Sequence, residues 1–553
     1  MYRNSLRLSI ISFIIVIASF LIIIKLFYLQ IFSSSYFKKL AQRQHTYVLE
    51  LFGERGRILD SQGIILAENT PSYSLYALPK KIKDREEIAR RLSLILKEPF
   101  SKILEKLSSD KPFVWIKRKL PKAKKEEISS LNNEGLGFIK ELKRVYPQGA
   151  LTSHILGIVD IDNKGLEGLE LKFDKYLRAR IGKGVFLRDS QGRILPLYKK
   201  LVPPRDGFNL VLNIDSKIQY FSQEILEETV KETKAKAGSV IVMEPSTGKV
   251  LALVNFPSFE PNNLGEFSLA NLRNRAITDF YEPGSVFKIV TLLAALSEKQ
   301  DLVKEAFFCE NGAYKIPGSV LHDWKRFGEL SFEEVFKNSS NIGVAKIAHI
   351  LGKEILFRYI NQLGFGKLTG IDLPGEVRGI VKPLSEWSKT SAFIIPIGQE
   401  VAVTLIQLAR AFSVIANGGY LVRPYVVDKI VDNKGVVIKR FFPQRRRVFP
   451  KKMVDKARDI LFKVVEEGTG KRAKIEGIKI AGKTGTAQKI DPQGGYSSSC
   501  YYASFVGFFP LEKPEYLIAV VVDEPRTYHY GGMVAAPLFR KIAQKIIEYK
   551  RIR

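Results

Sequence analysis

A Pro-Gly pair followed by an unusually apolar run is the feature that most constrains this sequence. Pro283 and Gly284 interrupt any regular structure before them, and the run Ser-Val-Phe-Lys-Ile-Val-Thr-Leu-Leu-Ala-Ala-Leu begins at Ser285. Apolar residues fall on nearly every side of a helix drawn through this run, whereas a surface helix keeps a polar face. We therefore predict a buried helix that begins at Ser285.

The predicted helix carries a serine and a lysine in its first turn. Ser285 and Lys288 are three residues apart and share one face. A helix start has unpaired N–H groups and a partial positive charge, so a serine hydroxyl there with an amine in reach has the parts of an activated nucleophile. The spacing alone does not identify a nucleophile, because Ser-x-x-Lys also begins at Ser35, Ser108 and Ser246. Only the copy at Ser285 follows a Pro-Gly break.

Two later motifs explain why a lysine would be buried in that helix. Ser-Ser-Asn occupies 339–341, and Lys-Thr-Gly-Thr occupies 483–486. Ser-x-x-Lys, Ser-x-Asn and Lys-Thr-Gly are the signature of penicillin-binding proteins and β-lactamases, and they occur here in that order. The chain resembles a class B penicillin-binding protein, a membrane-anchored transpeptidase of bacterial peptidoglycan synthesis. The resemblance covers nearly the whole chain.

The resemblance implies a role for each residue of the first two motifs. Ser285 would be the nucleophile of an acyl transfer and Lys288 its base. Lys288 must then be neutral, which burial and a second positive charge, Lys483, both favour. Ser339 would relay a proton to the leaving group, and Asn341 would hydrogen-bond the substrate amide.

The third motif would hold the substrate. By resemblance, the backbone N–H groups of Ser285 and Thr486 form the oxyanion hole, and the D-Ala-D-Ala carboxylate of a stem peptide is bound by Lys483, Thr484 and Thr486. Gly485 would let the strand approach the acyl group. For Thr484, a strand residue that faces the core is the alternative. The amine of a second stem peptide would then release the acyl group as a cross-link, and β-lactams would acylate the same serine.

An apolar run near the N-terminus predicts a membrane anchor. Residues 8–32 carry one charge, Lys25, and are long enough to span a bilayer; a buried core helix is the alternative. No cleavage site follows, so we expect an uncleaved, single-pass anchor. Lys38 and Lys39 balance Arg3 and Arg7, but the short tail, 1–7, favours a cytoplasmic N-terminus. The catalytic part would then lie outside the cytoplasm, at the bacterial inner membrane.

The remaining chain divides near Pro203-Pro204. We expect a pedestal, or dimerisation-like, domain at 33–205, in which Arg55–Asp60 and Gly165–Glu170 resemble two family signatures with structural ion pairs. The dense Lys, Glu and Leu at 85–143 predict a solvated helical subdomain. A transpeptidase domain follows at 206–553. Its predicted helix at 217–234 and hairpin at 240–254 resemble the start of the family's transpeptidase domain. That resemblance implies a five-stranded antiparallel sheet with helices on both sides, an α+β fold.

Composition narrows the choice of partners. The net charge of +30 suggests nucleic acid first, but no nucleic-acid-binding signature accompanies it. Anionic lipid and an anionic wall polymer fit better. Cys309 and Cys500 form no disulfide framework, and whether they pair is left open. No metal-ligand spacing occurs, so we expect no metal and no cofactor.

Three activities share the motifs. A serine β-lactamase must deacylate with water, and no glutamate after Asn341 is assignable by motif as its base. A β-lactam sensor would need a larger cytoplasmic part, and a non-catalytic homologue would have lost motif residues. The transpeptidase is therefore favoured. Glu282, where the elongation branch more often has proline, favours septal cell division over elongation and a polytopic glycan polymerase of the division machinery as partner.

Overall fold

The computed structural model describes residues 2–51, 53–188, 194–263, 265, 268–491 and 494–552. The chain forms two compact units, each made of two segments. The smaller unit contains Met1–Glu54 and Ala179–Gly207, and the larger contains Arg55–Arg178 and Phe208–Arg553.

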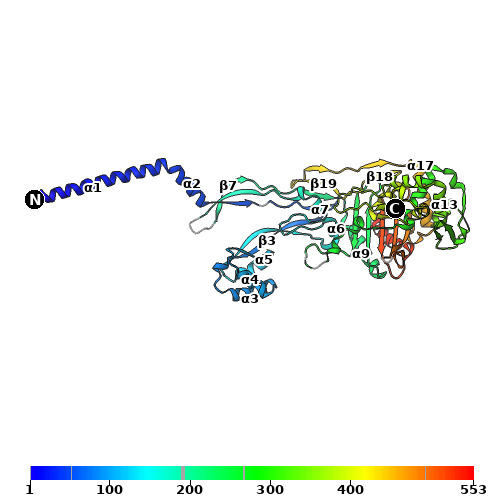
Figure 1. Cartoon of the computed structure of the whole chain (residues 1–553), viewed down its shortest axis with the longest axis horizontal. Helices are drawn as coiled ribbons and strands as arrows, with labels where there is room; N and C mark the ends of the chain where they lie inside the picture. The colour runs from blue at the N-terminus through cyan, green and yellow to red at the C-terminus, as the bar shows by residue number, and fades with distance from the viewer. Residues whose placement is uncertain are drawn as a thin grey trace. The chain divides into compact units, whose positions relative to one another are not determined.

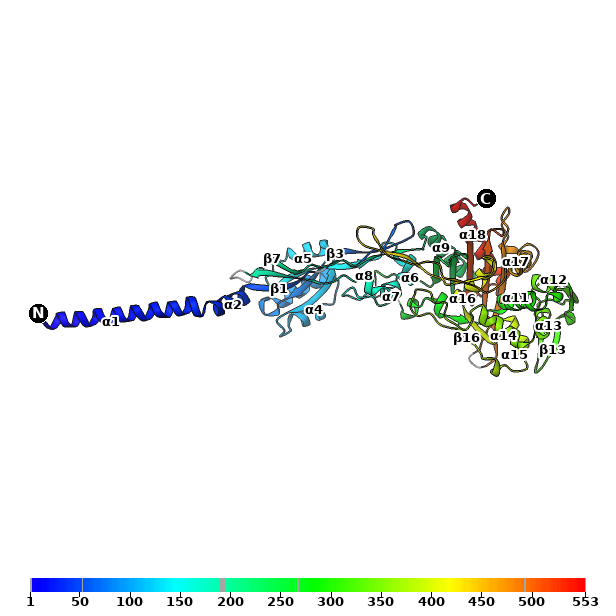
Figure 2. The same cartoon turned by 90° about the horizontal axis from the view of Figure 1, so that it is seen from above.

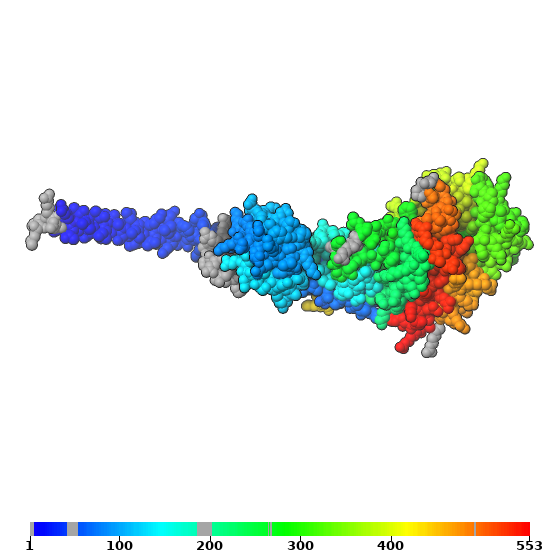
Figure 3. All heavy atoms as spheres, turned by 90° about the horizontal axis from the view of Figure 1, so that it is seen from below, coloured from blue at the N-terminus to red at the C-terminus, as the bar shows by residue number. Residues whose placement is uncertain are grey.

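A long apolar helix opens the smaller unit (Figure 1). α1 (Tyr2–Phe27) continues into a π-helical turn, η1 (Tyr28–Phe32), and α2 (Ser34–His45) follows. The span Ser5–Phe32 has 28 residues, a mean hydropathy of 2.9 and no buried residue (Figure 3). A helix of that length is about 42 Å long, more than a bilayer core requires. The helix is consistent with the predicted single-pass anchor.

A three-stranded antiparallel sheet completes the smaller unit. The order is β1-β6-β7, with β1 at Thr46–Leu51, β6 at Gly182–Arg188 and β7 at Ile194–Val202.

The first part of the larger unit is built on a long strand, β3 (Ile65–Ala77). The sheet order is β20-β19-β8-β2-β3-β4, and β5 also pairs with β3. The other strands are β2 (Ile58–Leu59), β4 (Val114–Leu120), β5 (Leu136–Val145), β8 (Asn209–Leu212), β19 (Val427–Val431) and β20 (Val437–Arg440).

The helical subdomain expected at 85–143 is only partly helical. It contains α3 (Arg85–Leu96), α4 (Phe100–Leu107) and α5 (Lys122–Ser129), but also β4 and β5. The prediction of helix alone was wrong because the lysines of β4 and β5 suggested a solvated helix. Ile116 and Leu120 of β4 are buried against Leu92 and Leu107, so strands and helices share one small core.

The two family signatures meet through buried ion pairs. Arg55 Nε lies 2.7 Å from Glu170 Oε2, and Arg144 Nε lies 2.7 Å from Glu170 Oε1. Arg55 also reaches Asp174 at 2.7 Å. These side chains, apart from Asp174, are at most 2% exposed. The prediction of structural ion pairs in this part of the chain is confirmed.

A five-stranded antiparallel sheet in the order β10-β9-β24-β23-β22 forms the centre of the second part (Figure 2). Along β9, Val240 and Val242 enter one core while Ile241 and Met243 enter the other, as the two-residue period of a strand requires. The strands are β9 (Ala237–Met243), β10 (Val250–Phe256), β22 (Ala481–Ile490), β23 (Tyr496–Phe509) and β24 (Tyr516–Asp523).

Helices cover both faces of this sheet, as predicted. α9 (Ser216–Glu232) and α18 (Gly531–Lys550) share one core. The opposite core contains α11 (Ile289–Glu298), α13 (Asn341–Leu351), α16 (Leu405–Ala416) and α17 (Lys451–Glu466). β22 begins at Ala481 and carries the whole Lys-Thr-Gly motif.

Shorter elements connect these. The helices are α6 (Ser153–Leu156), α7 (Gly168–Lys172), α8 (Asp174–Leu177), α10 (Arg275–Thr278), α12 (Phe332–Lys337), α14 (Lys353–Gln362) and α15 (Ser391–Ile394). The strands are β11 (Phe280–Tyr281), β12 (Ala306–Phe308), β13 (Ala313–Ile316), β14 (Ser319–His322), β15 (Glu329–Ser331), β16 (Ile380–Val381), β17 (Val401–Thr404), β18 (Tyr420–Val422) and β21 (Arg445–Arg447).

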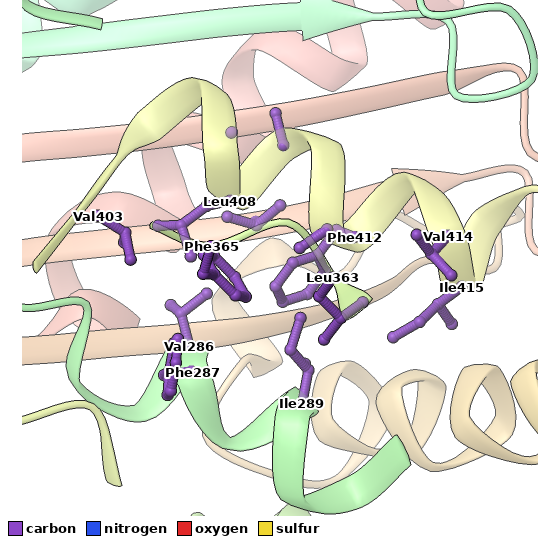
Figure 4. Packing of buried hydrophobic residues seen from close by; sticks show 14 of the residues in the cluster. Val286, Phe287, Ile289, Leu363, Phe365, Val403, Leu408, Phe412, Val414 and Ile415 are labelled. Carbon is purple, nitrogen blue, oxygen red and sulfur yellow. The ribbon is translucent and has the colours of Figure 1, made fainter. Parts of the chain in front are cut away.

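The predicted buried helix, α11, lies in the core that it shares with α13, α16 and α17. Every residue of α11 from Ile289 to Leu296 is buried. Phe287, just before it, packs on Phe365 with ring centroids 4.9 Å apart, and Phe412 of α16 lies in the same cluster (Figure 4). This packing fixes the segment that carries Ser285.

Candidate active site

Ser285 lies in a 3₁₀ turn and not in the α-helix itself. The turn η5 (Gly284–Lys288) precedes α11. Side chains three residues apart are eclipsed in a 3₁₀ turn, so Ser285 and Lys288 face the same side. Gly284 has φ +56°, and a Cβ there would lie 2.5 Å from the carbonyl oxygen of Thr486. A glycine is therefore required where the turn approaches β22.

The turn also depends on a second glycine, in β22. A Cβ on Gly485 would lie 2.3 Å from Ser504 Oγ of β23, 2.6 Å from Val286 Cγ2 and 2.8 Å from the carbonyl oxygen of Pro283. We expected Gly485 to make room for an acyl group. In the structure, the space beside it is taken by the segment that carries Ser285.

Lys288 is fully buried and surrounded by oxygen atoms. Its Nζ donates to the Ser339 carbonyl at 2.6 Å and to Asn341 Oδ1 at 2.7 Å, and lies 3.3 Å from Ser339 Oγ. Burial lowers the pKa of Lys288 to about 7, although the nearby Asp323 carboxylate acts in the opposite direction. The amine is thus close to half neutral near pH 7.

Lys483 reaches the same serine from β22. Its Nζ donates to Ser339 Oγ at 2.8 Å. Burial, and then the charge of Lys288, lower the pKa of Lys483 well below its ordinary value. Two ammonium groups on one hydroxyl would repel each other without water to screen them. The site therefore favours a state in which the two lysines share a single positive charge.

Ser339 has a backbone conformation that is rare for its residue type. Its φ is +58°, a left-handed conformation that is uncommon outside glycine, asparagine and aspartate. Ser339 lies in the turn between α12 and α13, and this conformation directs its hydroxyl toward both lysines. Asn341, the first residue of α13, also donates through Nδ2 to the His322 carbonyl at 2.9 Å.

An aspartate that sequence reasoning missed holds this turn in place. Asp323 Oδ2 accepts from Ser340 Oγ at 2.7 Å, and its Oδ1 accepts from the backbone N–H groups of Asn341 and Ile342. A carboxylate on the unpaired N–H groups of a helix start is stabilising. No spacing in the sequence links 323 to the motif at 339–341, because β15 and α12 lie between them.

The two threonines of the third motif have different surroundings. Thr484 is buried, and its hydroxyl pairs with that of Thr469 at 2.8 Å. Thr486 Oγ1 accepts from the Gly531 N–H at 2.9 Å, which leaves its own proton free to donate. The alternative interpretation of Thr484, a residue that faces inward, fits its contacts better than a role in carboxylate binding.

The structure brings together all three motifs that the sequence singled out. Ser285, Lys288, Ser339, Asn341 and Lys483 come from η5, the α12–α13 turn and β22. Both cysteines are free thiols. Cys309 is buried beneath the turn, 3.4 Å from Ser340 Oγ.

Comparison with known families matches both parts of the chain. Residues 238–544 match the penicillin-binding protein transpeptidase domain, and residues 51–212 match the penicillin-binding protein dimerisation domain.

Relatives match over almost their full length. The probable peptidoglycan D,D-transpeptidase PenA of Neisseria meningitidis is 34% identical over 93% of this chain and 88% of its own. Stage V sporulation protein D of Bacillus subtilis is 35% identical over 95% and 83%. The peptidoglycan D,D-transpeptidase FtsI of Buchnera aphidicola is 32% identical over 99% and 96%.

A solved structure shares the fold and the order of domains. Penicillin-binding protein 3 of Mycobacterium tuberculosis, in complex with aztreonam, superposes with a TM-score of 0.71 and 26% identity over 91% of this chain and 98% of its own. The motifs, the five-stranded sheet and these matches together show that the chain belongs to the class B penicillin-binding proteins, with a dimerisation domain followed by a transpeptidase domain.

Proposed function

We propose that this peptidoglycan D,D-transpeptidase works through an acyl-enzyme on Ser285. The observation that carries the proposal is the position of Ser339 Oγ, which is 3.3 Å from Lys288 Nζ and 2.8 Å from Lys483 Nζ. A base, a relay and a second amine thus form one connected group beside the turn that holds Ser285.

The first half of the reaction moves one proton and exchanges one bond. Neutral Lys288 takes the proton of Ser285 Oγ as the oxygen attacks the carbonyl of the penultimate D-Ala. The N–H groups of Ser285 and Thr486 stabilise the oxyanion. The C–N bond then breaks, and the proton passes through Ser339 to the departing D-Ala nitrogen. Lys483 and Thr486 hold the terminal carboxylate during these steps.

The second half reverses the proton path. The amine of a second stem peptide attacks the acyl carbon, loses a proton to the same group, and releases Ser285 as the cross-link forms. A β-lactam follows the first half only, because its leaving nitrogen stays tethered to the acyl group. The wall polymer and β-lactams are the ligands of this site.

Labelling with a fluorescent penicillin tests this assignment. The labelled peptide, mapped by mass spectrometry, should contain Ser285, and Ser285→Ala should remove the label while leaving the melting temperature unchanged. A label on Ser246, or one that persists in Ser285→Ala, would overturn the assignment.

We also propose that the enzyme acts in septal wall synthesis. Support comes from Glu282 before Pro-Gly-Ser and from relatives that are named FtsI. The α1 helix would anchor the chain in the inner membrane with its N-terminus in the cytoplasm, and a polytopic glycan polymerase would bind this helix and the dimerisation domain. Depletion should give filaments; round cells with normal septa would favour the elongation role.

A further inference from the structure

A cavity lies beside the end of β22, beyond the Lys-Thr-Gly-Thr motif. It has a volume of about 580 Å³. One wall is the end of β22, at 488–490, with Tyr496 and Tyr502 of β23. The facing wall is formed by 280–282, 380, 382 and 400–402. The cavity thus lies between the strand that carries Lys-Thr-Gly and the segment that leads to Ser285.

The direction of a bound donor peptide follows from the proposed function, on which this inference rests. The terminal carboxylate lies at Lys483, and the scissile carbonyl lies at the Thr486 N–H. The upstream residues of the donor must therefore extend toward Gln488 and Ile490. β22 is the edge strand of its sheet, so a peptide can pair with it as an added antiparallel strand. At about 3.3 Å per residue, the cavity begins roughly 7 Å beyond Thr486 and ends at roughly 13 Å.

Two buried oxygen atoms in the cavity wall lack a partner. Tyr281 is 5% exposed, and its hydroxyl has no hydrogen-bond partner among the residues that the structure describes. The same holds for Glu282 Oε2. The other oxygen of Glu282 is occupied, since Oε1 accepts from the Glu400 N–H at 2.8 Å and from Tyr496 Oη at 3.1 Å. Oε2 is therefore the oxygen of this carboxylate that no described hydrogen bond occupies.

The charges around the cavity leave Glu282 without a counter-ion. Lys489 is held by Asp523 at 2.6 Å and Glu524 at 2.7 Å. Lys382 lies 3.7 Å from Glu400. Within the described part of the chain, no salt bridge reaches Glu282, and burial raises the pKa of its carboxyl group. A ligand that brings a cation would supply the missing charge.

The chemistry of cross-linking indicates which cation the ligand would carry. Every stem that can act as acceptor carries a primary amine, and donors and acceptors are strands of the same polymer. A donor stem therefore carries an amine as well, upstream of its D-Ala-D-Ala end. We propose that this cavity binds the side-chain ammonium of the donor stem through Glu282, with the Tyr281 hydroxyl as a second acceptor, and so selects donors whose amine is still free.

The test compares donor peptides that differ only at the amine. Stem peptides with a free, a dimethylated or an acetylated side-chain amine would acylate the purified full-length enzyme in detergent, with D-Ala release as the readout. The free and dimethylated forms are cations and the acetylated form is neutral. A charge-assisted hydrogen bond predicts at least about a tenfold lower kcat/KM for the acetylated donor.

Variants of Glu282 and Tyr281 test whether these residues cause the preference for a donor with a charged amine. Glu282→Gln keeps the acceptor oxygen for Glu400 and Tyr496 but removes the charge, so the ratio of free to acetylated donor should fall to about one. Tyr281→Phe removes a single unpartnered oxygen and should lower the ratio in part. Glu512→Gln alters an exposed ion pair with Lys479 on the same domain and should keep the full ratio.

The outcomes separate this inference from the proposed function. A wild-type enzyme that is labelled by penicillin at Ser285 but treats all three donors alike would overturn the donor-ammonium site alone. A ratio that survives in Glu282→Gln would overturn the role of that residue. If all three donors acylate the enzyme equally, but transfer to an acceptor is slower when the acceptor's second stem amine is acetylated than when it is free, the cavity binds the acceptor and not the donor. Absence of labelling at Ser285 would overturn the proposed function itself.

Discussion

Lys288 and Lys483 donate to the same hydroxyl, Ser339 Oγ, although 194 residues separate them in the chain. Each lysine is buried, and burial lowers the pKa of both. The serine hydroxyl therefore lies between two amines, and in the proposed mechanism the charge state of the pair governs whether Ser285 can be activated.

The first prediction concerns the chemistry of Lys288. Lys288→Arg keeps a cation but cannot deprotonate in a protein. General-base catalysis contributes roughly 10²- to 10⁴-fold, so penicillin acylation should slow by at least about 100-fold. Stopped-flow or gel-based acylation rates measure the loss, and circular dichroism checks the fold. Acylation within tenfold of the wild type would identify another group as the base.

The pH dependence of acylation follows from the same pKa. Lys288 acts as a base only when neutral, and its pKa is about 7. The acylation rate should therefore rise with pH through about 7 and level off above it. An unperturbed lysine would give a rise near 10. A profile that is flat between pH 6 and 8 would contradict a neutral Lys288 as the base.

A third prediction concerns Asp323. Asp323→Asn keeps one acceptor oxygen but removes a charge that raises the pKa of Lys288. The acid limb of the acylation profile should thus shift to lower pH. Loss of the helix-start interaction should also lower the stability by about 1 kcal/mol. The shift of the pH profile separates electrostatics from a purely structural role, which would lower the rate equally at every pH.

The sequence could single out residues that meet in the structure because they lie in three short motifs. The Pro-Gly break and the apolar run from Ser285 indicated the buried helix, and the two apolar runs on either side of residues 244–248 indicated the β9–β10 hairpin. Asp323, Thr469 and the cavity beside Glu282 were missed. Each depends on contacts between distant segments, for which local periodicity carries no signal. The strands β4 and β5 were missed because their lysines hide the apolar alternation.

The dimerisation domain offers a prediction about stability alone. Glu170 accepts from both Arg55 and Arg144 in a buried site. Glu170→Gln leaves two buried guanidinium groups with less negative charge, which predicts a loss of about 3 kcal/mol. Urea unfolding measures the loss, and Glu87→Gln in the exposed pair with Arg91 is the control. The penicillin acylation rate per folded molecule should not change, and a fall in that rate would indicate coupling to the active site.

The last prediction tests why Gly485 is a glycine. Gly485→Ala would put a Cβ 2.3 Å from Ser504 Oγ of β23, 2.6 Å from Val286 Cγ2 and 2.8 Å from the Pro283 carbonyl oxygen, so both the Ser504 side chain and the turn that holds Ser285 must shift. Overpacking of this kind costs about 1–3 kcal/mol, and the displaced oxyanion donors should slow acylation by roughly 100-fold. Gly328→Ala is the matched control, because the nearest atom to its Cβ lies 4.0 Å away. Melting temperature and acylation rate are measured for both variants. If Gly485→Ala loses stability but acylates at the wild-type rate, the glycine serves packing only, and the separation between the turn and β22 does not control the reaction.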